Sequence, residues 1–230
     1  MTVLYRILCL FIGYICGLLE TGVIYGKLKG VDIRNYGSKN LGTTNALRVL
    51  GPRAGIVVLI GDFCKSFIPC IIARLIFKDA FPDTFLIYVL YTGFGAVLGH
   101  IFPFYLHFKG GKGVATIGGM IVGLLSGWMI LILLILFVST VAISKYLSLG
   151  SICLMVEFAV IYVIFAFYGL LCFDKSDPES FRVMLESFVI VFLFAGLSVY
   201  RHKENIKRLL NNEENRFSFH KSEDIKIDEK

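Results

Sequence analysis

Residues 151–173 read SICLMVEFAVIYVIFAFYGLLCF, a run of 23 residues in which Glu157 is the one formally charged side chain. A helix needs about 20 mostly apolar residues to cross the hydrocarbon core of a bilayer, which is about 30 Å thick. This run is long enough and apolar enough for such a crossing. It therefore predicts a transmembrane helix and an integral membrane protein.

Similar runs occupy most of the chain before residue 200. They are Tyr5–Tyr25, Arg53–Leu75, Thr84–His100, Val114–Leu125, Met129–Ile143 and Met184–Tyr200. The run at 114–125 is short for a full crossing, so it either begins earlier, in the glycine-rich stretch before it, or is re-entrant. We predict an all-α, polytopic transmembrane helical bundle of about seven helices, with five or six as the alternative.

The composition also indicates a membrane protein. Hydrophobic residues make up 57% of the 230 residues and charged residues 17%, whereas soluble domains carry about 25% charged residues. The net charge of +6 could indicate a nucleic-acid partner. In so apolar a chain, excess lysine and arginine are more typical of cytoplasmic loops. We therefore expect the lipid bilayer, and no nucleic acid, as the partner.

The distribution of basic residues predicts the orientation of the bundle. Seven crossings place the two termini on opposite sides of the membrane. With the C-terminus inside, 17 of the 23 lysines and arginines fall in cytoplasmic loops and the tail, and five fall outside. Because cytoplasmic loops are enriched in these residues, we predict that the N-terminus lies outside and the C-terminus in the cytoplasm.

The chain divides into a membrane domain, residues 1–210, and a polar tail, Asn211–Lys230. The tail lacks apolar periodicity and is predicted to be mobile. Six cysteines are scattered through the apolar runs, without a C-x-x-C pair and without a histidine at ligand spacing. We therefore expect no metal site and no cofactor.

Three polar stretches interrupt the apolar runs, and the predicted topology places all three on the cytoplasmic side. The first is Asn35–Asn45 (NYGSKNLGTTN), followed by Arg48. Its glycines, hydroxyls and amides suit a backbone cradle for an anion, and the planar fork of Arg48 matches phosphate oxygens. The alternative is a turn-rich connector whose charge reflects only its side of the membrane.

The second stretch is Gly99–Thr116 (GHIFPFYLHFKGGKGVAT). Gly110, Gly111 and Gly113 bracket Lys112 just before an apolar run, so backbone N–H groups can converge on an anion beside the ammonium group. The spacing of a Walker A loop is missing. A close helix–helix contact through the glycines is the alternative, and it leaves Lys112 unexplained.

The third stretch is Arg201–Leu210 (RHKENIKRLL), which follows the last apolar run. If it is helical, His202 and Asn205 share one face. A basic helix lying on the membrane surface is the alternative. The short link Lys145–Ser151, between the runs at 129–143 and 151–173, returns to the same side and brings Ser148 and Ser151 near the other stretches.

Ionisable residues inside the spans are candidates for function. Asp62 and Lys65 lie three apart and can pair with each other. Glu20 lies near the inner end of the first helix, and Glu157 lies well inside another. These residues leave open a second class of function, a transporter of phosphate esters or other anions. A transporter needs access from both sides, whereas the anion-binding stretches are predicted on one.

Taken together, the polar stretches resemble the bacterial membrane glycerol-3-phosphate acyltransferases of the PlsY type, which use acyl-phosphate as donor. The matching segments are Gly37–Arg48, Gly99–Pro103 with Phe108–Thr116, Lys145–Ser151, and His202–Asn205 with Arg208 and Leu209. They follow the order of the family and cover most of the chain.

The resemblance implies a seven-helix fold in the bacterial inner (cytoplasmic) membrane, with the active site facing the cytoplasm. The implied reaction moves a fatty acyl group from acyl-phosphate to the sn-1 hydroxyl of glycerol 3-phosphate, giving lysophosphatidic acid and inorganic phosphate. These two phosphates are the expected small-molecule partners, and no obligate protein partner is predicted. Because a mixed anhydride is already activated, positioning can supply much of the rate without a covalent nucleophile.

The resemblance also implies roles for individual residues. Ser38 and Arg48 would hold phosphate oxygens, and Lys112 would neutralise phosphate and the developing oxyanion. His202 and Asn205 would orient a substrate. The further phosphate-binding residues are predicted to be Asn40, Thr44, Asn45, His100, Gly110, Gly111, Gly113, Ser148, Ser151 and Arg208. Either His202 or the donor's own phosphate would take the hydroxyl proton, and we favour the phosphate because no carboxylate–histidine pair is evident.

Two features depart from the family pattern. Leu19-Glu20-Thr21-Gly22 stands where the family commonly has a Ser-Ile-Pro-like segment, and the tail Asn211–Lys230 is longer than the family often shows. Neither departure touches the three stretches.

Overall fold

The regular structure of the protein is helical throughout the part of the chain that the computed structural model describes, residues 2–217. The helices are α1 (Thr2–Gly17), α2 (Thr21–Leu28), α3 (Thr43–Leu50), α4 (Pro52–Phe77), α5 (Leu86–Ile101), α6 (Val114–Gly123), α7 (Gly127–Ser144), α8 (Leu147–Phe167), α9 (Pro178–Arg201) and α10 (Lys203–Leu210), with short 3-10 turns at Ile33–Asn35 and Phe104–Leu106. Residues 218–230 of the predicted mobile tail lie outside the described part.

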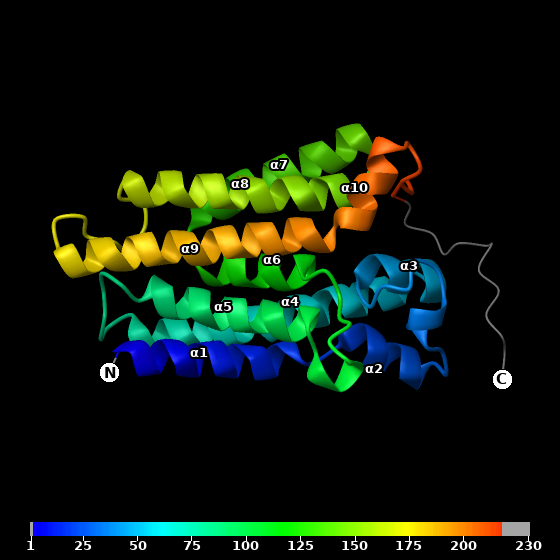
Figure 1. Ribbon diagram of the computed structural model, residues 1–230, viewed down its shortest axis with the longest axis horizontal. Coiled ribbons are helices and arrows are strands. Elements are labelled where there is room, and N and C mark those ends of the chain that lie inside the picture. The colour runs from blue at the N-terminus through cyan, green and yellow to red at the C-terminus, as the bar shows by residue number, and fades with distance from the viewer. Residues whose placement is uncertain (1, 218–230) are drawn as a thin grey trace.

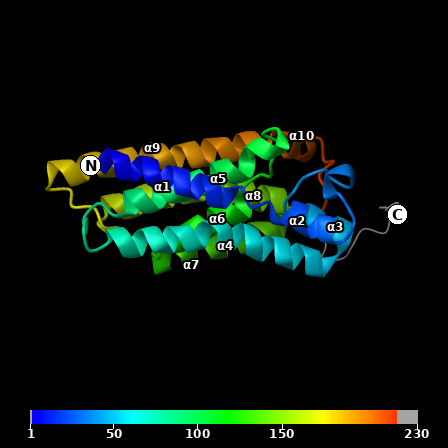
Figure 2. The ribbon, with the colours of Figure 1, turned by 90° about the horizontal axis from the view of Figure 1, so that it is seen from below.

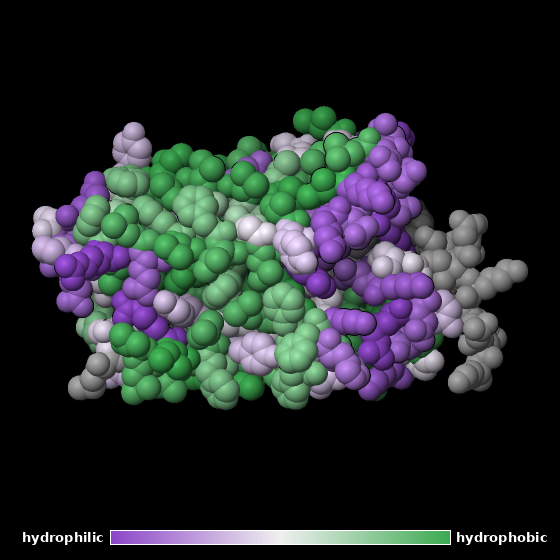
Figure 3. All heavy atoms as spheres, viewed as in Figure 1, coloured by the Kyte–Doolittle hydropathy of each residue, from purple (hydrophilic) through white to green (hydrophobic). Residues whose placement is uncertain are grey.

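Six segments are long and apolar enough to cross a membrane, and α6 is a shorter apolar helix. The first of the long segments consists of α1 and α2 together, and the other five are α4, α5, α7, α8 and α9. They run side by side along the long axis of the molecule, with the N-terminus at one end and α10 at the other (Figures 1 and 2). The visible face is apolar along its middle and hydrophilic at both ends (Figure 3). The predicted all-α transmembrane bundle is confirmed.

The first apolar run is one candidate span, Thr2–Leu28, as the sequence predicts, but it is broken into two helices instead of forming a single one. The chain leaves helical geometry between Gly17 and Thr21, and Glu20 stands at the N-cap position of α2. The carbonyl of Leu18 accepts a hydrogen bond from the Tyr105 hydroxyl at 2.6 Å, and that of Leu19 accepts one from Lys65 Nζ at 2.8 Å. A break inside a membrane bundle is tolerated because other protein groups satisfy the freed carbonyls.

Helices α1 and α5 pack with their backbones in direct contact. Gly13 and Gly17 on α1, and Gly95 and Gly99 on α5, stand four residues apart on their helices. A Cβ atom at any of these positions would overlap a backbone carbonyl of the partner helix. Small residues with this spacing let membrane helices approach closely. This contact fixes the positions from which the loops at the α10 end of the bundle begin.

The short helix α6 crosses toward the far end of the bundle. It begins at Val114, after the glycine-rich loop, so the alternative in which it begins within that loop is wrong. The loop folds over the end of α5, where Gly110 N donates to the carbonyl of Ile101 at 3.0 Å. Past α6, the carbonyl of Leu124 accepts from Arg74, near the far end of α4, at 2.7 Å. Helix α6 is therefore not re-entrant.

The fifth long segment, α8, begins four residues earlier than the sequence predicts and ends at Phe167. Lys145 has a left-handed φ of 64° at the end of α7, and Tyr146 stands at the N-cap position of α8. Because α8 begins directly after this two-residue turn, Ser148 and Ser151 lie on its first turns and are held by helical backbone.

The α1–α5 contact yields a test of packing. We expect Gly95→Ala to lower the thermal midpoint of the detergent-solubilised protein, because overpacking costs about 1–3 kcal/mol. Gly196→Ala on α9 is the matched control, since a Cβ there has open space. Equal midpoints for the two variants would contradict this close contact.

Candidate active site

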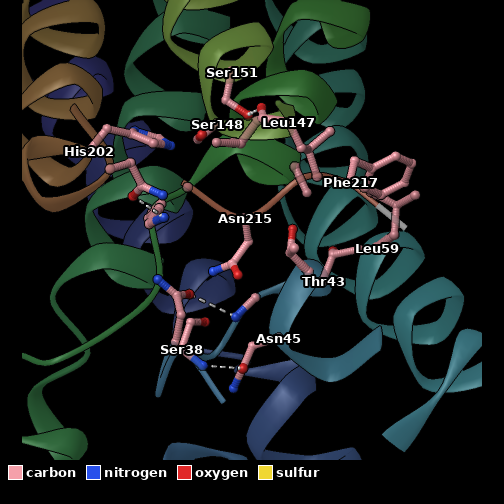
Figure 4. Close-up of a pocket in the computed structure, with 18 of the residues that line it drawn as sticks. Ser38, Thr43, Asn45, Leu59, Leu147, Ser148, Ser151, His202, Asn215 and Phe217 are labelled. Atoms are coloured by element: carbon pink, nitrogen blue, oxygen red, sulfur yellow. Dashed lines mark hydrogen bonds between the residues drawn. The ribbon is translucent and has the colours of Figure 1, made fainter. Parts of the chain in front are cut away.

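One pocket at the α10 end of the bundle is lined by residues from all three polar stretches and from the α7–α8 link. It has a volume of about 200 Å³. In Figure 4, His202 points into it from the end of α9, Ser148 and Ser151 face it from α8, and Ser38, Thr43 and Asn45 lie on the opposite side. Of the fifteen site residues predicted from the sequence, thirteen line it: Ser38, Asn40, Thr44, Asn45, Arg48, His100, Lys112, Gly113, Ser148, Ser151, His202, Asn205 and Arg208.

Gly110 and Gly111 do not line the pocket, in contrast to the prediction. A Cβ at Gly110 would overlap the carbonyl oxygen of His100, and one at Gly111 would overlap the His100 ring. These two glycines therefore allow the loop to lie against the end of α5. Gly113 has a φ of 83°, which favours glycine, and it turns the chain into α6.

The first polar stretch is shaped by the buried side chain of Asn45. Its Oδ1 accepts from the backbone N–H of Ser38 at 2.8 Å, and its Nδ2 donates to the carbonyls of Ile33 at 2.9 Å and Tyr36 at 3.2 Å. Both N–H groups and the carbonyl oxygen of this amide thus bond to the backbone of the loop. Asn45 therefore fixes the loop and places Ser38 at the pocket edge.

Three cationic side chains, Arg48, Lys112 and Arg208, line the pocket. Lys112 Nζ donates to Asn205 Oδ1, which joins the second stretch to the third. Burial lowers the pKa of Lys112 to about 8, against the opposing effect of the Glu214 carboxylate. Burial likewise lowers the pKa of Arg48. An anion in the pocket would replace the lost hydration of these cations.

Arg201 supports the glycine loop, a role that the sequence analysis missed. Its Nη2 donates to the carbonyls of Gly110 at 3.0 Å and Gly111 at 3.2 Å. The arginine precedes His202 directly, so a single short segment both supports the loop and lines the pocket. Only its basic character was visible in the sequence.

His202 is buried and presents a hydrogen-bond acceptor. Its Nδ1 lies 2.7 Å from the carbonyl of Ser198, which can only accept, so Nδ1 carries the proton. Burial, and next the charge of Lys112, lower the pKa of the His202 imidazole to about 4. At neutral pH the ring is therefore neutral, with an unprotonated Nε2 available to a hydroxyl donor.

His100 belongs to a buried cluster that the sequence did not predict in full. Lys65 Nζ lies 2.7 Å from His100 Nδ1, 3.1 Å from Asp62 Oδ1 and 3.8 Å from Glu20 Oε1. The predicted Asp62–Lys65 pair is confirmed. Glu20 Oε1 also lies 3.2 Å from His100 Nδ1, so an ammonium group and a carboxylate both contact this ring nitrogen. The cluster therefore holds the His100 ring in place at the edge of the pocket.

Glu20, Asp62 and His100 are the one group with metal-ligand geometry among residues 2–217, with ligand atoms within 4.8 Å of one another. The Lys65 ammonium lies at hydrogen-bonding or ion-pairing distance from all three. A cation is therefore already present among these ligands. Their chemistry fits the lysine side chain better than a divalent ion.

Further residues line the pocket although no pattern in the sequence predicted them. Leu59, Phe137 and Leu147 form an apolar part of the wall, and Glu214 and Phe217 reach it from the tail. Apolar residues in transmembrane runs all look alike in the sequence, so those that face the pocket cannot be distinguished from those that face lipid. Glu157 is not among the lining residues.

A helical membrane protein with a cationic, hydrogen-bonding pocket at one end of the bundle belongs to the membrane proteins that handle anionic ligands. Comparison with known proteins defines the family. The model of the glycerol-3-phosphate acyltransferase family matches residues 7–212, and the chain belongs to that family. The predicted membership is thereby confirmed.

Curated relatives and solved structures agree with this assignment. Glycerol-3-phosphate acyltransferases of Chlorobaculum tepidum and Fusobacterium nucleatum are 39% and 40% identical, over 90% of this chain in both cases and 94% and 95% of the relatives. The crystal structures of PlsY (YgiH), an integral membrane glycerol 3-phosphate acyltransferase, are similar in the glycerol 3-phosphate form (TM-score 0.75, 33% identity) and the lysophosphatidic acid form (0.73, 32%). Both cover 93% of this chain and 96% of the solved chain.

The buried cluster yields a stability prediction. Lys65→Met leaves the carboxylates of Glu20 and Asp62 without their cation, and removing one partner of a buried pair costs about 3–5 kcal/mol. We expect a large drop in the thermal midpoint. Adding Glu20→Gln and Asp62→Asn to Lys65→Met should recover much of it, and Lys109→Met, at an exposed position, is the control. A midpoint unchanged by Lys65→Met would contradict the cluster.

Proposed function

We propose that the protein transfers a fatty acyl group from acyl-phosphate to the sn-1 hydroxyl of glycerol 3-phosphate, releasing lysophosphatidic acid and inorganic phosphate. The observation that carries this proposal is the single pocket in which Arg48, Lys112 and Arg208 meet. Both substrates are phosphates, and an apolar wall beside the cations suits the acyl chain. Membership of the acyltransferase family supports the same reaction class.

In this proposal the cations hold the phosphate groups of the two substrates. Arg48 offers a planar fork to phosphate oxygens, and Lys112 offers a point charge beside it. Ser38, held by Asn45, completes the phosphate contacts from the first stretch. Ser148 and Ser151 add hydroxyls from α8, although Ser151 Oγ also donates to the carbonyl of Leu147 at 2.8 Å.

His202 and Lys112 have complementary roles. His202 Nε2 accepts a hydrogen bond from the attacking hydroxyl of glycerol 3-phosphate and orients it. The Lys112 ammonium is the donor available to the oxygen of the acyl carbonyl as negative charge develops there. Asn205 positions the Lys112 ammonium through their shared hydrogen bond.

The reaction needs no covalent enzyme intermediate. The hydroxyl oxygen attacks the acyl carbonyl carbon, and the bond from that carbon to the phosphate oxygen breaks. The hydroxyl proton passes to the departing phosphate. The low pKa of His202 makes it a weak base, which favours a positioning role over proton removal. Bringing two bound substrates together can supply several kcal/mol of the barrier, about 7–11 kcal/mol in well-oriented cases.

We also propose that the pocket faces the cytoplasm of a bacterial inner membrane. The excess of basic residues in the segments at the pocket end supports this orientation. In a cysteine-free background, Lys109→Cys and Asp79→Cys introduce exposed thiols at the pocket end and the far end. An impermeant maleimide should label Asp79→Cys in intact cells and Lys109→Cys only after lysis. The reverse pattern would overturn the orientation.

The reaction itself is tested with purified protein, acyl-phosphate and glycerol 3-phosphate. Phosphate release and lysophosphatidic acid formation should rise together, with acyl-CoA inactive as donor. Activity with acyl-CoA but not acyl-phosphate would overturn the proposed donor. Sealed vesicles that accumulate labelled glycerol 3-phosphate without forming product would instead indicate a transporter.

The pKa of Lys112 predicts a basic limb in the pH profile. Its ammonium is charged below about pH 8 and loses its proton above it, so kcat/KM should fall about ten-fold per pH unit beyond that value. In Lys112→Arg, kcat/KM should not fall above pH 8, because the guanidinium group stays charged. This holds whatever the maximal rate of the variant. Lys112→Ala should nearly abolish turnover while leaving membrane insertion intact. A basic limb that survives in Lys112→Arg would exclude Lys112 as its source.

A further inference from the structure

The segment after α10 folds back over the pocket. Residues Asn211–Phe217 leave the helix through a turn at Asn212, which has a φ of 57°. The N–H of Glu213 donates to the carbonyl of Arg208 at 2.8 Å, and that of Phe217 donates to the carbonyl of Lys145 at 2.8 Å. The segment is therefore attached at both ends, to α10 and to the α7–α8 turn, with the pocket between them.

Glu214 places a carboxylate among the groups that would bind phosphate. Its side chain is only 6% exposed. One oxygen accepts from Asn205 Nδ2 at 3.1 Å and the other from Arg208 Nε at 2.9 Å. Lys112 bonds the same Asn205 from its other side. Both carboxylate oxygens are thus engaged by donors of the third polar stretch, as the oxygens of a bound phosphate would be.

Phe217 reaches the apolar part of the same pocket. It lines the pocket together with Leu59, Phe137 and Leu147 (Figure 4). The segment therefore combines an anionic group and an apolar group three residues apart, each in matching surroundings. A ligand with a phosphate head and an acyl chain combines the same two groups.

The family model matches residues 7–212, so the match ends within this segment. Glu214 and Phe217 lie beyond it. The proposed reaction assigns no role to either residue.

We propose that residues 211–217 form an internal pseudosubstrate, in which Glu214 occupies a phosphate subsite and Phe217 the adjoining apolar wall. A phosphorylated ligand must displace the segment to bind. This inference rests on the proposed function, because it takes the pocket to be a phosphate site. A role for Glu214 as proton acceptor is less favoured, since both of its oxygens are already hydrogen-bonded.

The displacement lowers the apparent affinity for phosphate. A pocket that is open in a fraction of the molecules binds with the intrinsic dissociation constant divided by that fraction. If the segment is docked in about nine of ten molecules, removing it should tighten phosphate binding about ten-fold. The pseudosubstrate thereby sets the phosphate concentration at which the pocket fills.

Calorimetric titration of the full-length protein with inorganic phosphate tests this inference. Glu214→Gln should bind phosphate about ten-fold more tightly than the wild type. Phe217→Ala should also tighten binding, although it changes no charge, because it weakens docking of the same segment. Glu213→Gln is the matched control, since it removes the same charge from an exposed neighbour and should leave affinity unchanged. Unchanged or weaker binding in Glu214→Gln would overturn the pseudosubstrate.

Hydrogen exchange supplies a second measurement that does not depend on turnover. Saturating phosphate should speed exchange at the amides of Glu213 and Phe217, whose carbonyl partners are lost when the segment leaves. Unchanged exchange at both amides, with phosphate bound, would also overturn the inference. If the wild type transfers acyl groups but binds phosphate as tightly as Glu214→Gln, only the pseudosubstrate is overturned. A protein that neither binds phosphate nor transfers acyl groups overturns the proposed function as well.

Discussion

The ammonium group of Lys65 connects the break between α1 and α2 with the end of α5. It donates to the carbonyl freed at the break and lies 2.7 Å from Nδ1 of His100. The backbone carbonyl of His100 accepts from Gly111 in the glycine loop. Within a bilayer such freed groups must find partners in the protein. Lys65, with Glu20 and Asp62, therefore makes the unwinding at these points tolerable.

The site combines fixed charges with a histidine of defined hydrogen-bond polarity. The carbonyl of Ser198 accepts a hydrogen bond from His202 Nδ1, which leaves Nε2 as an acceptor. Cations from three separate segments surround the same space, and burial raises the cost of leaving them unpaired. The same physics explains why the carboxylate of Glu214 is found there: an anion of any source is stabilised in that position.

The sequence predicted the transmembrane class, the helices and most residues that meet in the pocket, because apolar runs and glycine-flanked cations have strong local signals. Other features depend on distant parts of the chain. The break before Thr21 needs Lys65 and Tyr105, and the role of Gly110 and Gly111 needs His100 as their neighbour. Arg201 looked like one more basic residue in a basic stretch. Glu214 lay in a tail whose composition predicted mobility.

The central physical claim is that three segments distant in the sequence form one anion site. The most direct measurement is the stoichiometry and affinity of inorganic phosphate for the wild type and for Arg48→Ala, Lys112→Ala and Arg208→Ala. We predict that every one of these substitutions weakens binding at one shared site, and that pairs of them are not additive because their side chains contact the same ligand. Independent sites, or substitutions whose effects add fully, would contradict a single pocket.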